Sequence, residues 1–313
     1  MAALKCEPVS DDLFPGFASR WIDAPAGRIF ARVGGDGPPL LLLHGFPETH
    51  ACFHRIAPAL AKTHTVVCPD LRGYGWSSAP KGDPVHETYS KRAMGRDVIR
   101  VMEKLGHVRF ALAGHDRGAR VAYRLALDEP GRVERLALLD IVPTFANWQR
   151  IREGQADAPH WDYLARPFPQ PETEIGRDPL AYFDGLLAKW SKDGTLEAFD
   201  PRALAAYRQS CNEPSRIHAF CEDYRAGATV DLRQDEADLA AGRTIACPVL
   251  VVVAQFYLTR GARPDAEAPL AVWRRSFAPQ ATGAEVDSGH FVAEEAPEAT
   301  LAALQAFLGA PQP

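Results

Sequence analysis

The chain has 313 residues, of which 46% are hydrophobic and 24% are charged. This composition is typical of a globular protein and excludes a disordered chain, a collagen or a small disulfide scaffold. The 35 Lys and Arg residues against 40 Asp and Glu residues give a net charge of −5, which argues against a nucleic-acid-binding protein.

Three further features concern the compartment. The longest apolar run, residues 249–254, is far shorter than the about 20 residues that cross a bilayer, so no membrane contact is expected. Charged residues between Lys5 and Asp12 interrupt any signal-peptide core, so no secretory signal is predicted. The six cysteines form no Cys-x-x-Cys pair, which predicts free thiols in a reducing cytoplasm and no zinc site.

Strands and helices alternate through the first half of the chain. Short, wholly apolar strands between amphipathic helices are typical of a mostly parallel sheet with helices on both faces. The pattern predicts strands at 28–33, 40–43, 65–68, 110–113 and 136–139, and helices at 49–62, 91–105 and 118–126.

The alternation stops after residue 143. Residues 145–240 read as helices rich in Trp, Tyr and Pro, and strands return at 249–253 and 284–286 before a helix at 296–308. We therefore expect an α/β core in two parts, 1–144 and 241–313, with a helical cap at 145–240. A cap of this kind encloses a small, water-poor pocket.

The run Gly114-His115-Asp116-Arg117-Gly118 lies between a predicted strand and a predicted helix. It matches the Gly-x-Ser-x-Gly nucleophile elbow with Asp in place of Ser. The helix N-terminus favours the anionic form of Asp116. Asp116 is therefore the candidate nucleophile, although an Asp that simply caps a helix would give the same pattern.

Enzymes with this elbow keep the chain order nucleophile, acid, histidine. His290, in Ser288-Gly-His-Phe, follows the last predicted strand and is the candidate base. Asp140 ends the strand after the elbow helix and is preferred as the acid. The next acid after the later strand is Asp265, which is the alternative.

Backbone N–H groups complete the expected site. The turn His44-Gly-Phe-Pro47 follows the strand at 40–43, where this architecture supplies one oxyanion donor, here the N–H of Phe46. The second donor is the N–H of the residue after the nucleophile, Arg117.

An Asp nucleophile restricts the reaction. Attack on an sp³ carbon gives an ester, which water activated by His290 can hydrolyse, whereas a Ser would leave a stable ether. Asp116 therefore indicates opening of a carbon–halogen bond or an epoxide. Arg117 and Arg120 share a helix face, and guanidinium pairs bind carboxylates, which indicates a substrate with a carboxylate beside the reacting carbon.

With these motifs, and with His160-Trp161 and Cys221-Glu-Asp-Tyr-Arg225, the chain resembles the fluoroacetate dehalogenases over nearly its whole length. The resemblance implies an α/β-hydrolase fold, conversion of haloacetates to glycolate and halide, no cofactor or metal, and a homodimer. It implies a substrate carboxylate on Arg117 and Arg120. It further implies a halide cradle of His160, Trp161 and Tyr224, with Trp190 in the pocket.

The resemblance has one departure. Residues 254–260, Ala-Gln-Phe-Tyr-Leu-Thr-Arg, lack the Trp-Gly pair common after that strand, and their bulky rings are expected to reshape the pocket.

Three alternatives remain open. An epoxide hydrolase shares the Asp nucleophile but needs two cap tyrosines, which Tyr163, Tyr182, Tyr207 and Tyr224 could supply. A haloalkane dehalogenase typically has Trp where this chain has Arg117. A non-catalytic receptor for a small acid would usually lack a catalytic residue.

Overall fold

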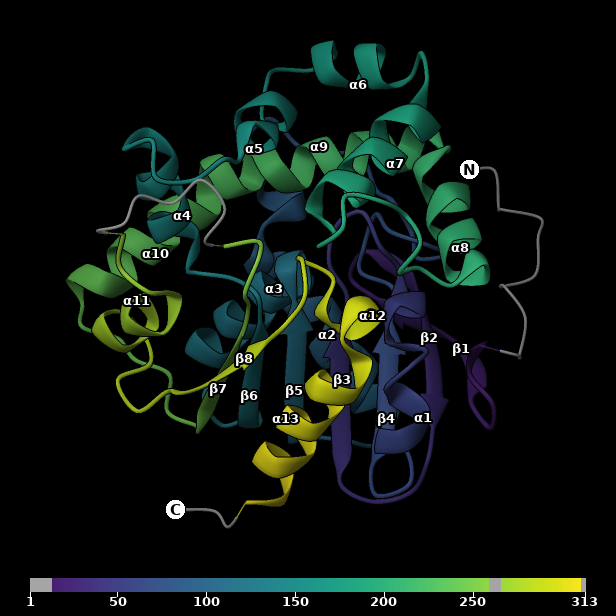
Figure 1. Ribbon diagram of the computed structural model, residues 1–313, viewed down its shortest axis with the longest axis vertical. Helices are drawn as coiled ribbons and strands as arrows, with labels where there is room; N and C mark the ends of the chain where they lie inside the picture. The colour runs from purple at the N-terminus through teal and green to yellow at the C-terminus, as the bar shows by residue number, and fades with distance from the viewer. Residues whose placement is uncertain (1–12, 259–265, 311–313) are drawn as a thin grey trace.

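An eight-stranded sheet is the centre of the protein in a computed structural model that describes residues 13–258 and 266–310 (Figure 1). The strand order is β1-β2-β4-β3-β5-β6-β7-β8. The pairs β1–β2 and β2–β4 are antiparallel and the other five are parallel, which confirms the predicted α/β class. The strands are β1 (Ala18–Ala24), β2 (Gly27–Gly34), β3 (Pro39–Leu43), β4 (Thr65–Pro69), β5 (Phe110–His115), β6 (Val133–Leu139), β7 (Val249–Ala254) and β8 (Thr282–Val286).

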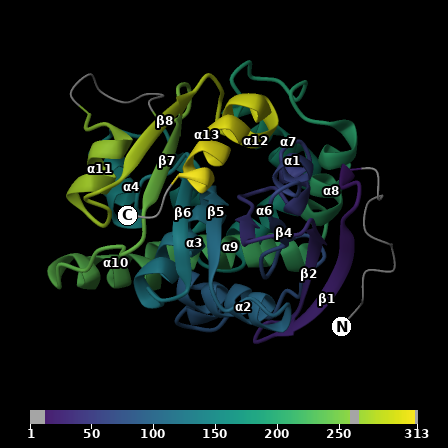
Figure 2. The same ribbon diagram turned by 90° about the horizontal axis from the view of Figure 1, so that it is seen from below.

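Helices cover both faces of this sheet. Seen from below, α2 (Lys91–Lys104) and α3 (Asp116–Asp128) lie on one face, while α1 (Ala57–Leu60), α12 (Val292–Glu295) and α13 (Pro297–Gly309) lie on the other (Figure 2). Because both faces are covered, the central strands are apolar throughout instead of alternating.

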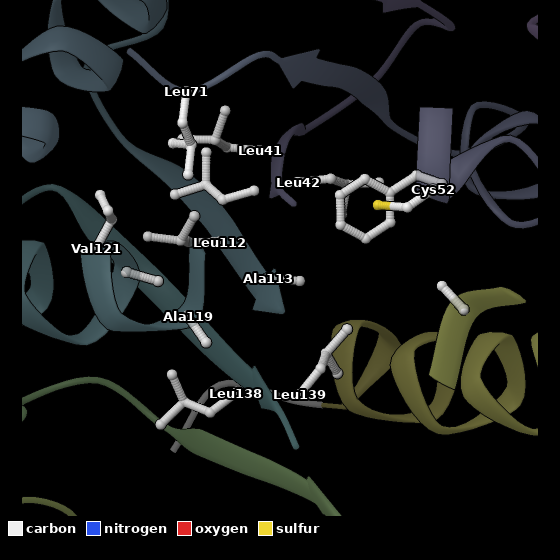
Figure 3. Packing of buried hydrophobic residues seen from close by; sticks show 14 of the residues in the cluster. Leu41, Leu42, Cys52, Leu71, Leu112, Ala113, Ala119, Val121, Leu138 and Leu139 are labelled. Carbon is white, nitrogen blue, oxygen red and sulfur yellow. The ribbon is translucent and has the colours of Figure 1, made fainter. Parts of the chain in front are cut away.

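The core lies around β3, β5 and β6. Leu41 of β3 pairs with Leu112 of β5, which in turn pairs with Leu136 of β6, and all three are buried. Side chains from both faces of these strands pack against the helices (Figure 3). This packing fixes the ends of β5 and β6, from which Asp116 and Asp140 follow directly.

Helices occupy the chain between β6 and β7, and Figure 1 shows them gathered at one end of the sheet. They are α4 (Thr144–Arg152), α5 (Pro159–Leu164), α6 (Gln170–Ile175), α7 (Pro179–Trp190), α8 (Pro201–Cys211), α9 (Pro214–Ala228) and α10 (Val230–Ala240). The remaining helix, α11 (Pro269–Arg275), follows β7. Among residues 13–258 and 266–310, no helix is long and apolar enough to cross a membrane.

Two local predictions were wrong. The predicted helix at 49–62 is instead a 3₁₀ turn (His50–Phe53) followed by the short α1. Pro58 lies in the first turn of α1 and has no N–H to continue a helix from the preceding residues. The edge strand β1 was missed because three consecutive exposed residues in it hide any clear alternation.

Candidate active site

The turn between β5 and α3 presents Asp116 above the sheet. Asp116 has a φ of +42°, a conformation that non-glycine residues rarely adopt. The turn stays close to β3 because Gly118 has no side chain: a Cβ there would lie 2.3 Å from the carbonyl oxygen of Leu43. Strained backbone of this kind is concentrated at functional sites.

Asp140 and His290 are brought together by different strands. Asp140 directly follows β6, has a φ of +53° and is fully buried. Its Oδ1 accepts a hydrogen bond of 3.0 Å from the N–H of Ala254, and its Oδ2 lies 2.7 Å from Nδ1 of His290. The carboxylate is thus held from two sides and orients the imidazole.

The Asp116 carboxylate faces both the imidazole and the predicted oxyanion turn. Its Oδ2 accepts a hydrogen bond of 3.1 Å from the N–H of Phe46, and its Oδ1 lies 3.8 Å from Nε2 of His290. The Arg117 N–H, the second expected donor, makes no hydrogen bond to this carboxylate. Burial raises the pKa of Asp116, but the charges of His290, Arg117 and Arg120 outweigh it, so the net shift is downward.

A small cavity of about 40 Å³ opens beside these three residues. Its wall includes the arginine expected to hold a carboxylate, Arg120, and the aromatic side chains of Trp161, Trp190 and Tyr257. The remaining lining residues are Asp116, Asp140, Asn147, Arg150, Ala156, Asp157, Ala158, Lys189, Leu258 and His290. A space of this size suits a small molecule.

Arg117 and Arg120 are both buried on α3. Within the described residues, Nη1 of Arg117 and Nε of Arg120 are buried and have no hydrogen-bond partner. The guanidinium of Arg117 packs over the ring of Tyr224 at 4.2 Å, and that of Arg120 packs over Trp161 at 4.5 Å. Burial and the charge of Arg117 lower the pKa of Arg120. One N–H group on each of these two buried cations can therefore bind an anion.

The predicted halide residues meet on one side of the site. The ring of Tyr224, from α9, lies 5.7 Å from that of His160 and 5.8 Å from that of Trp161, both from α5. All three side chains are buried, and none makes a hydrogen bond to the part of the chain that the structure describes. Burial lowers the pKa of His160 to about 3, so its ring is neutral and keeps one N–H to donate.

Trp190 joins the helical segment to the loop that carries the base. The N–H of His290 donates to the carbonyl oxygen of Trp190 at 2.8 Å. A Cβ at Gly289 would lie 2.3 Å from the backbone nitrogen of Lys192, so only glycine fits at this position of the loop. The Trp190 ring lies 4.5 Å from that of His160, which places it beside the predicted halide residues.

Sequence reasoning gave no role to two buried groups beside the site, His115 and Asp223. His115, inside the elbow motif, bridges Oε2 of Glu48 at 2.9 Å and the carbonyl oxygen of His290 at 2.8 Å. Asp223, inside the segment Cys221–Arg225, accepts hydrogen bonds from Arg117. Each belongs to a quoted motif, so motif membership was the available signal. Their burial and their partners could not be read from the sequence.

A third such residue is the half-buried Tyr257, in the segment noted only as a departure from the family. Its ring lies 3.9 Å from that of His290. Asp265, the alternative acid, and Thr259 and Arg260 of the same segment lie outside the described residues. In residues 13–258 and 266–310, no cluster of three or more His, Cys, Asp and Glu side chains is arranged to hold a metal ion.

The sequence matches a known family and two related enzymes along most of its length. The model of the alpha/beta hydrolase fold family matches residues 38–297. A fluoroacetate dehalogenase from Burkholderia sp. is 43% identical over 297 residues, which span 95% of each chain. A soluble epoxide hydrolase from Corynebacterium sp. (strain C12) is 31% identical over 288 residues, 87% of this chain and 90% of the relative.

Two solved structures also superpose on nearly the whole chain. A putative α/β hydrolase from Nostoc sp. PCC 7120 superposes with a TM-score of 0.88 at 46% identity, over 94% of this chain and 99% of the other. A mutant of a putative epoxide hydrolase from Pseudomonas aeruginosa, with bound MFA, superposes with a TM-score of 0.86 at 42% identity, over 96% and 97%. These matches confirm two predictions, that the protein has the α/β-hydrolase fold and that it is a hydrolase. The chain belongs to the α/β-hydrolase family, within which it is related to the fluoroacetate dehalogenases.

Proposed function

We propose that this protein hydrolyses haloacetates such as fluoroacetate to glycolate and halide. The observation that carries the proposal is a set of buried donors around Asp116 without partners in the described chain. The cationic ones are Nη1 of Arg117 and Nε of Arg120, whose other nitrogens are hydrogen-bonded in part to Asp223, Val142 and Thr144. The neutral ones are on the buried side chains of His160, Trp161 and Tyr224. A haloacetate supplies an acceptor to both sets, a carboxylate for the arginines and a developing halide for the others.

The first half-reaction is a displacement. A carboxylate oxygen of Asp116 forms a bond to the halogen-bearing carbon while the carbon–halogen bond breaks and the halide leaves with the bonding electrons. The lowered pKa of Asp116 keeps this carboxylate ionised. Fluoride is a poor leaving group, so the N–H and O–H donors of His160, Trp161 and Tyr224 must meet its charge as it forms.

The second half-reaction is ester hydrolysis. His290 takes a proton from water, and the water oxygen attacks the Asp116 carbonyl carbon. The ester C–O bond then breaks, the imidazolium returns the proton to the leaving glycolate oxygen, and the Asp116 carboxylate is restored. The separation of 3.8 Å between Nε2 of His290 and Oδ1 of Asp116 suits a base that acts through water. Asp140 stabilises the imidazolium through Nδ1. The Phe46 N–H, with that of Arg117 as the second donor, stabilises the oxyanion.

The epoxide hydrolase alternative has less support. It needs two phenol donors from the helical segment, and of the four tyrosines only Tyr224 contacts the site. The hydroxyl of Tyr207 donates to Glu294 and that of Tyr163 to Glu174, and the ring of Tyr182 packs on that of Tyr163. A neutral epoxide also needs neither Arg117 nor Arg120.

The deciding experiment measures halide release from fluoroacetate and chloroacetate at equal concentration, with styrene oxide hydrolysis beside them. We expect fluoride release that is lost in Asp116→Asn, with deamidation excluded by intact mass. In His290→Ala the carboxymethyl ester on Asp116 should accumulate, visible as a stable mass increase. Hydrolysis of the epoxide alone, or normal turnover in Asp116→Asn, would overturn the proposal.

Three further expectations remain predictions. The division at residues 144 and 240 makes α4 to α10 the cap that closes the pocket. A homodimer is expected, and light scattering of the purified protein tests it. The cytoplasmic location is tested by cell fractionation of the source organism.

A further inference from the structure

Residues 255–258 follow β7, and two of them, Tyr257 and Leu258, form part of the cavity wall. The N–H of Phe256 donates to the carbonyl oxygen of Ser288 at 3.2 Å, next to the loop that carries His290. Nη2 of Arg150, from α4, donates to the carbonyl oxygen of Leu258 at 3.2 Å. The segment is therefore held from the loop after β8 and from the helical segment, which fixes the residue between these two anchors.

That residue is Tyr257, and its ring lies on the imidazole of His290. The two ring centroids are 3.9 Å apart and the planes are inclined by 31°. Trp190 adds an edge-to-face contact of 6.0 Å with each of the two rings, at 65° to Tyr257 and 87° to His290. The rings of His115 and Phe291 also lie near the imidazole, at 4.6 and 5.4 Å, and Asp140 accepts its hydrogen bond.

The Tyr257 hydroxyl takes no part in holding the ring. It makes no hydrogen bond to the described residues, although the side chain lines the cavity beside Asp116 and Arg120. Burial raises the pKa of Tyr257 and the charges of Asp116 and Asp140 add to this rise, so the phenol stays neutral. What Tyr257 gives to His290 is therefore its aromatic face.

We propose that Tyr257 is a positioning residue, whose ring keeps the His290 imidazole turned with Nε2 towards Asp116. Of the four rings around His290, that of Tyr257 is the nearest and the most nearly parallel, so it opposes rotation of the imidazole about the Cβ–Cγ bond most directly. A ring at 3.9 Å, inclined by 31°, leaves no room for that rotation. The same face attracts the imidazolium that forms when His290 accepts the proton of water.

This role predicts which of the two half-reactions becomes slower when the Tyr257 ring is removed. The displacement by Asp116 needs no base, whereas hydrolysis of the ester needs Nε2 within reach of water and of the ester carbon. Loss of the ring should therefore slow the second half-reaction and leave the first nearly unchanged. This part of the inference rests on the proposed function.

The kinetic test compares Tyr257→Phe, which keeps the ring, with Tyr257→Leu, which removes it. Rapid quenching followed by intact-mass analysis during turnover of fluoroacetate gives the fraction of enzyme held as ester. We expect Tyr257→Phe to behave like the wild type. We expect kcat to fall about tenfold to 100-fold in Tyr257→Leu, with the ester accumulating, since small misplacements of a reacting group cost this much.

Phe256→Leu is the matched control, because Phe256 is the neighbouring ring in the same segment and is 47% exposed. It should leave kcat and the ester fraction at their wild-type values. Wild-type kcat without ester accumulation in Tyr257→Leu, or an equal loss in Phe256→Leu, would overturn the proposal.

A second measurement needs no substrate. An aromatic ring at 3.9 Å shifts the imidazole proton resonances of His290 upfield, which histidine-labelled protein makes visible by NMR. The shift should persist in Tyr257→Phe and become smaller in Tyr257→Leu, where the rings of Trp190, His115 and Phe291 remain. Unchanged resonances in Tyr257→Leu would contradict the ring contact. Should the wild type release no halide, the proposed function fails while this test still decides the positioning of His290.

Discussion

Arg117 shares its guanidinium with Asp223, so that only one of its nitrogens is left for a ligand. Nε and Nη2 of Arg117 lie 3.2 and 2.7 Å from Oδ1 of Asp223, and Nη1 has no hydrogen-bond partner within the described chain. Lys91 also donates to this carboxylate oxygen, and Tyr74 donates to the other at 2.7 Å. Asp223 therefore orients the guanidinium of Arg117 and with it the unpartnered Nη1.

The first prediction concerns Asp223→Asn. The amide keeps an acceptor but loses the charge, so Arg117 is held less firmly and binds a substrate carboxylate less well. We expect KM for haloacetates to rise about tenfold, which corresponds to about 1.4 kcal/mol, with a smaller change in kcat. Steady-state halide release measures both constants.

The matched control is Asp231→Asn. Asp231 also accepts from Lys91 but has no contact with Arg117, so this variant disturbs the lysine without freeing the arginine. It should leave KM near the wild-type value. An equal rise in both variants would mean that Lys91, and not the Arg117–Asp223 pair, governs the effect.

The second prediction concerns the leaving group. In His160→Phe a ring still packs against Trp190, but the N–H that we propose to face the halide is lost. Because fluoride depends more on hydrogen bonding as it leaves than chloride does, kcat for fluoroacetate should fall about 100-fold and kcat for chloroacetate much less. Parallel measurements with halide electrodes give the ratio. An unchanged fluoride-to-chloride ratio would remove His160 from the halide site.

The sequence predicted the fold class, and the residues that it nominated as reacting groups lie together in the structure. Asp116 and His290 lie in short motifs whose spacing relative to the strands is fixed by the architecture, and Asp140 follows its strand directly. Residues of this kind are predictable because a parallel sheet brings the carboxyl ends of its strands to one edge.

The supporting contacts were not predictable. Asp223 lies on α9, more than 100 positions after Arg117, and its partner depends on how α9 packs over the sheet. Tyr257 could be recognised as unusual, but its contact with His290 follows from the path of the chain after β7. Long-range pairing of side chains is a property of the packed molecule, which neither spacing nor composition records.

The third prediction concerns pH and stability. The pKa of His115 is raised to about 9, because Glu48 and other nearby carboxylates outweigh the lowering effect of burial. A pKa above the unfolded value contributes stability that is complete below the unfolded pKa, 6.5, and is lost as pH rises through about 9. The loss amounts to about 3 kcal/mol at most.

Urea unfolding at several values from pH 6.5 to 9.5 measures this loss in the wild type. The double variant Glu48→Gln with His115→Gln replaces the ion pair by neutral amides of similar size. It should show a shallower decline of the free energy of unfolding over the same interval. Parallel curves for the two proteins would show that the pair is not charged in the folded state.

The last prediction concerns the packing that holds the elbow. In Gly118→Ala the new methyl group would lie 2.3 Å from the carbonyl oxygen of Leu43 and 2.4 Å from that of His44, both backbone atoms that cannot move without disturbing the oxyanion turn. We expect a loss of about 3 kcal/mol in the free energy of unfolding, or no folded protein. Gly185→Ala is the control, because Gly185 lies within α7 with no atom within 4 Å of its Cβ position. Alanine there should stabilise the helix by about 0.5–1 kcal/mol. Equal urea midpoints for the two variants would mean that α3 can move away from β3, and the close approach of the elbow would then not depend on glycine.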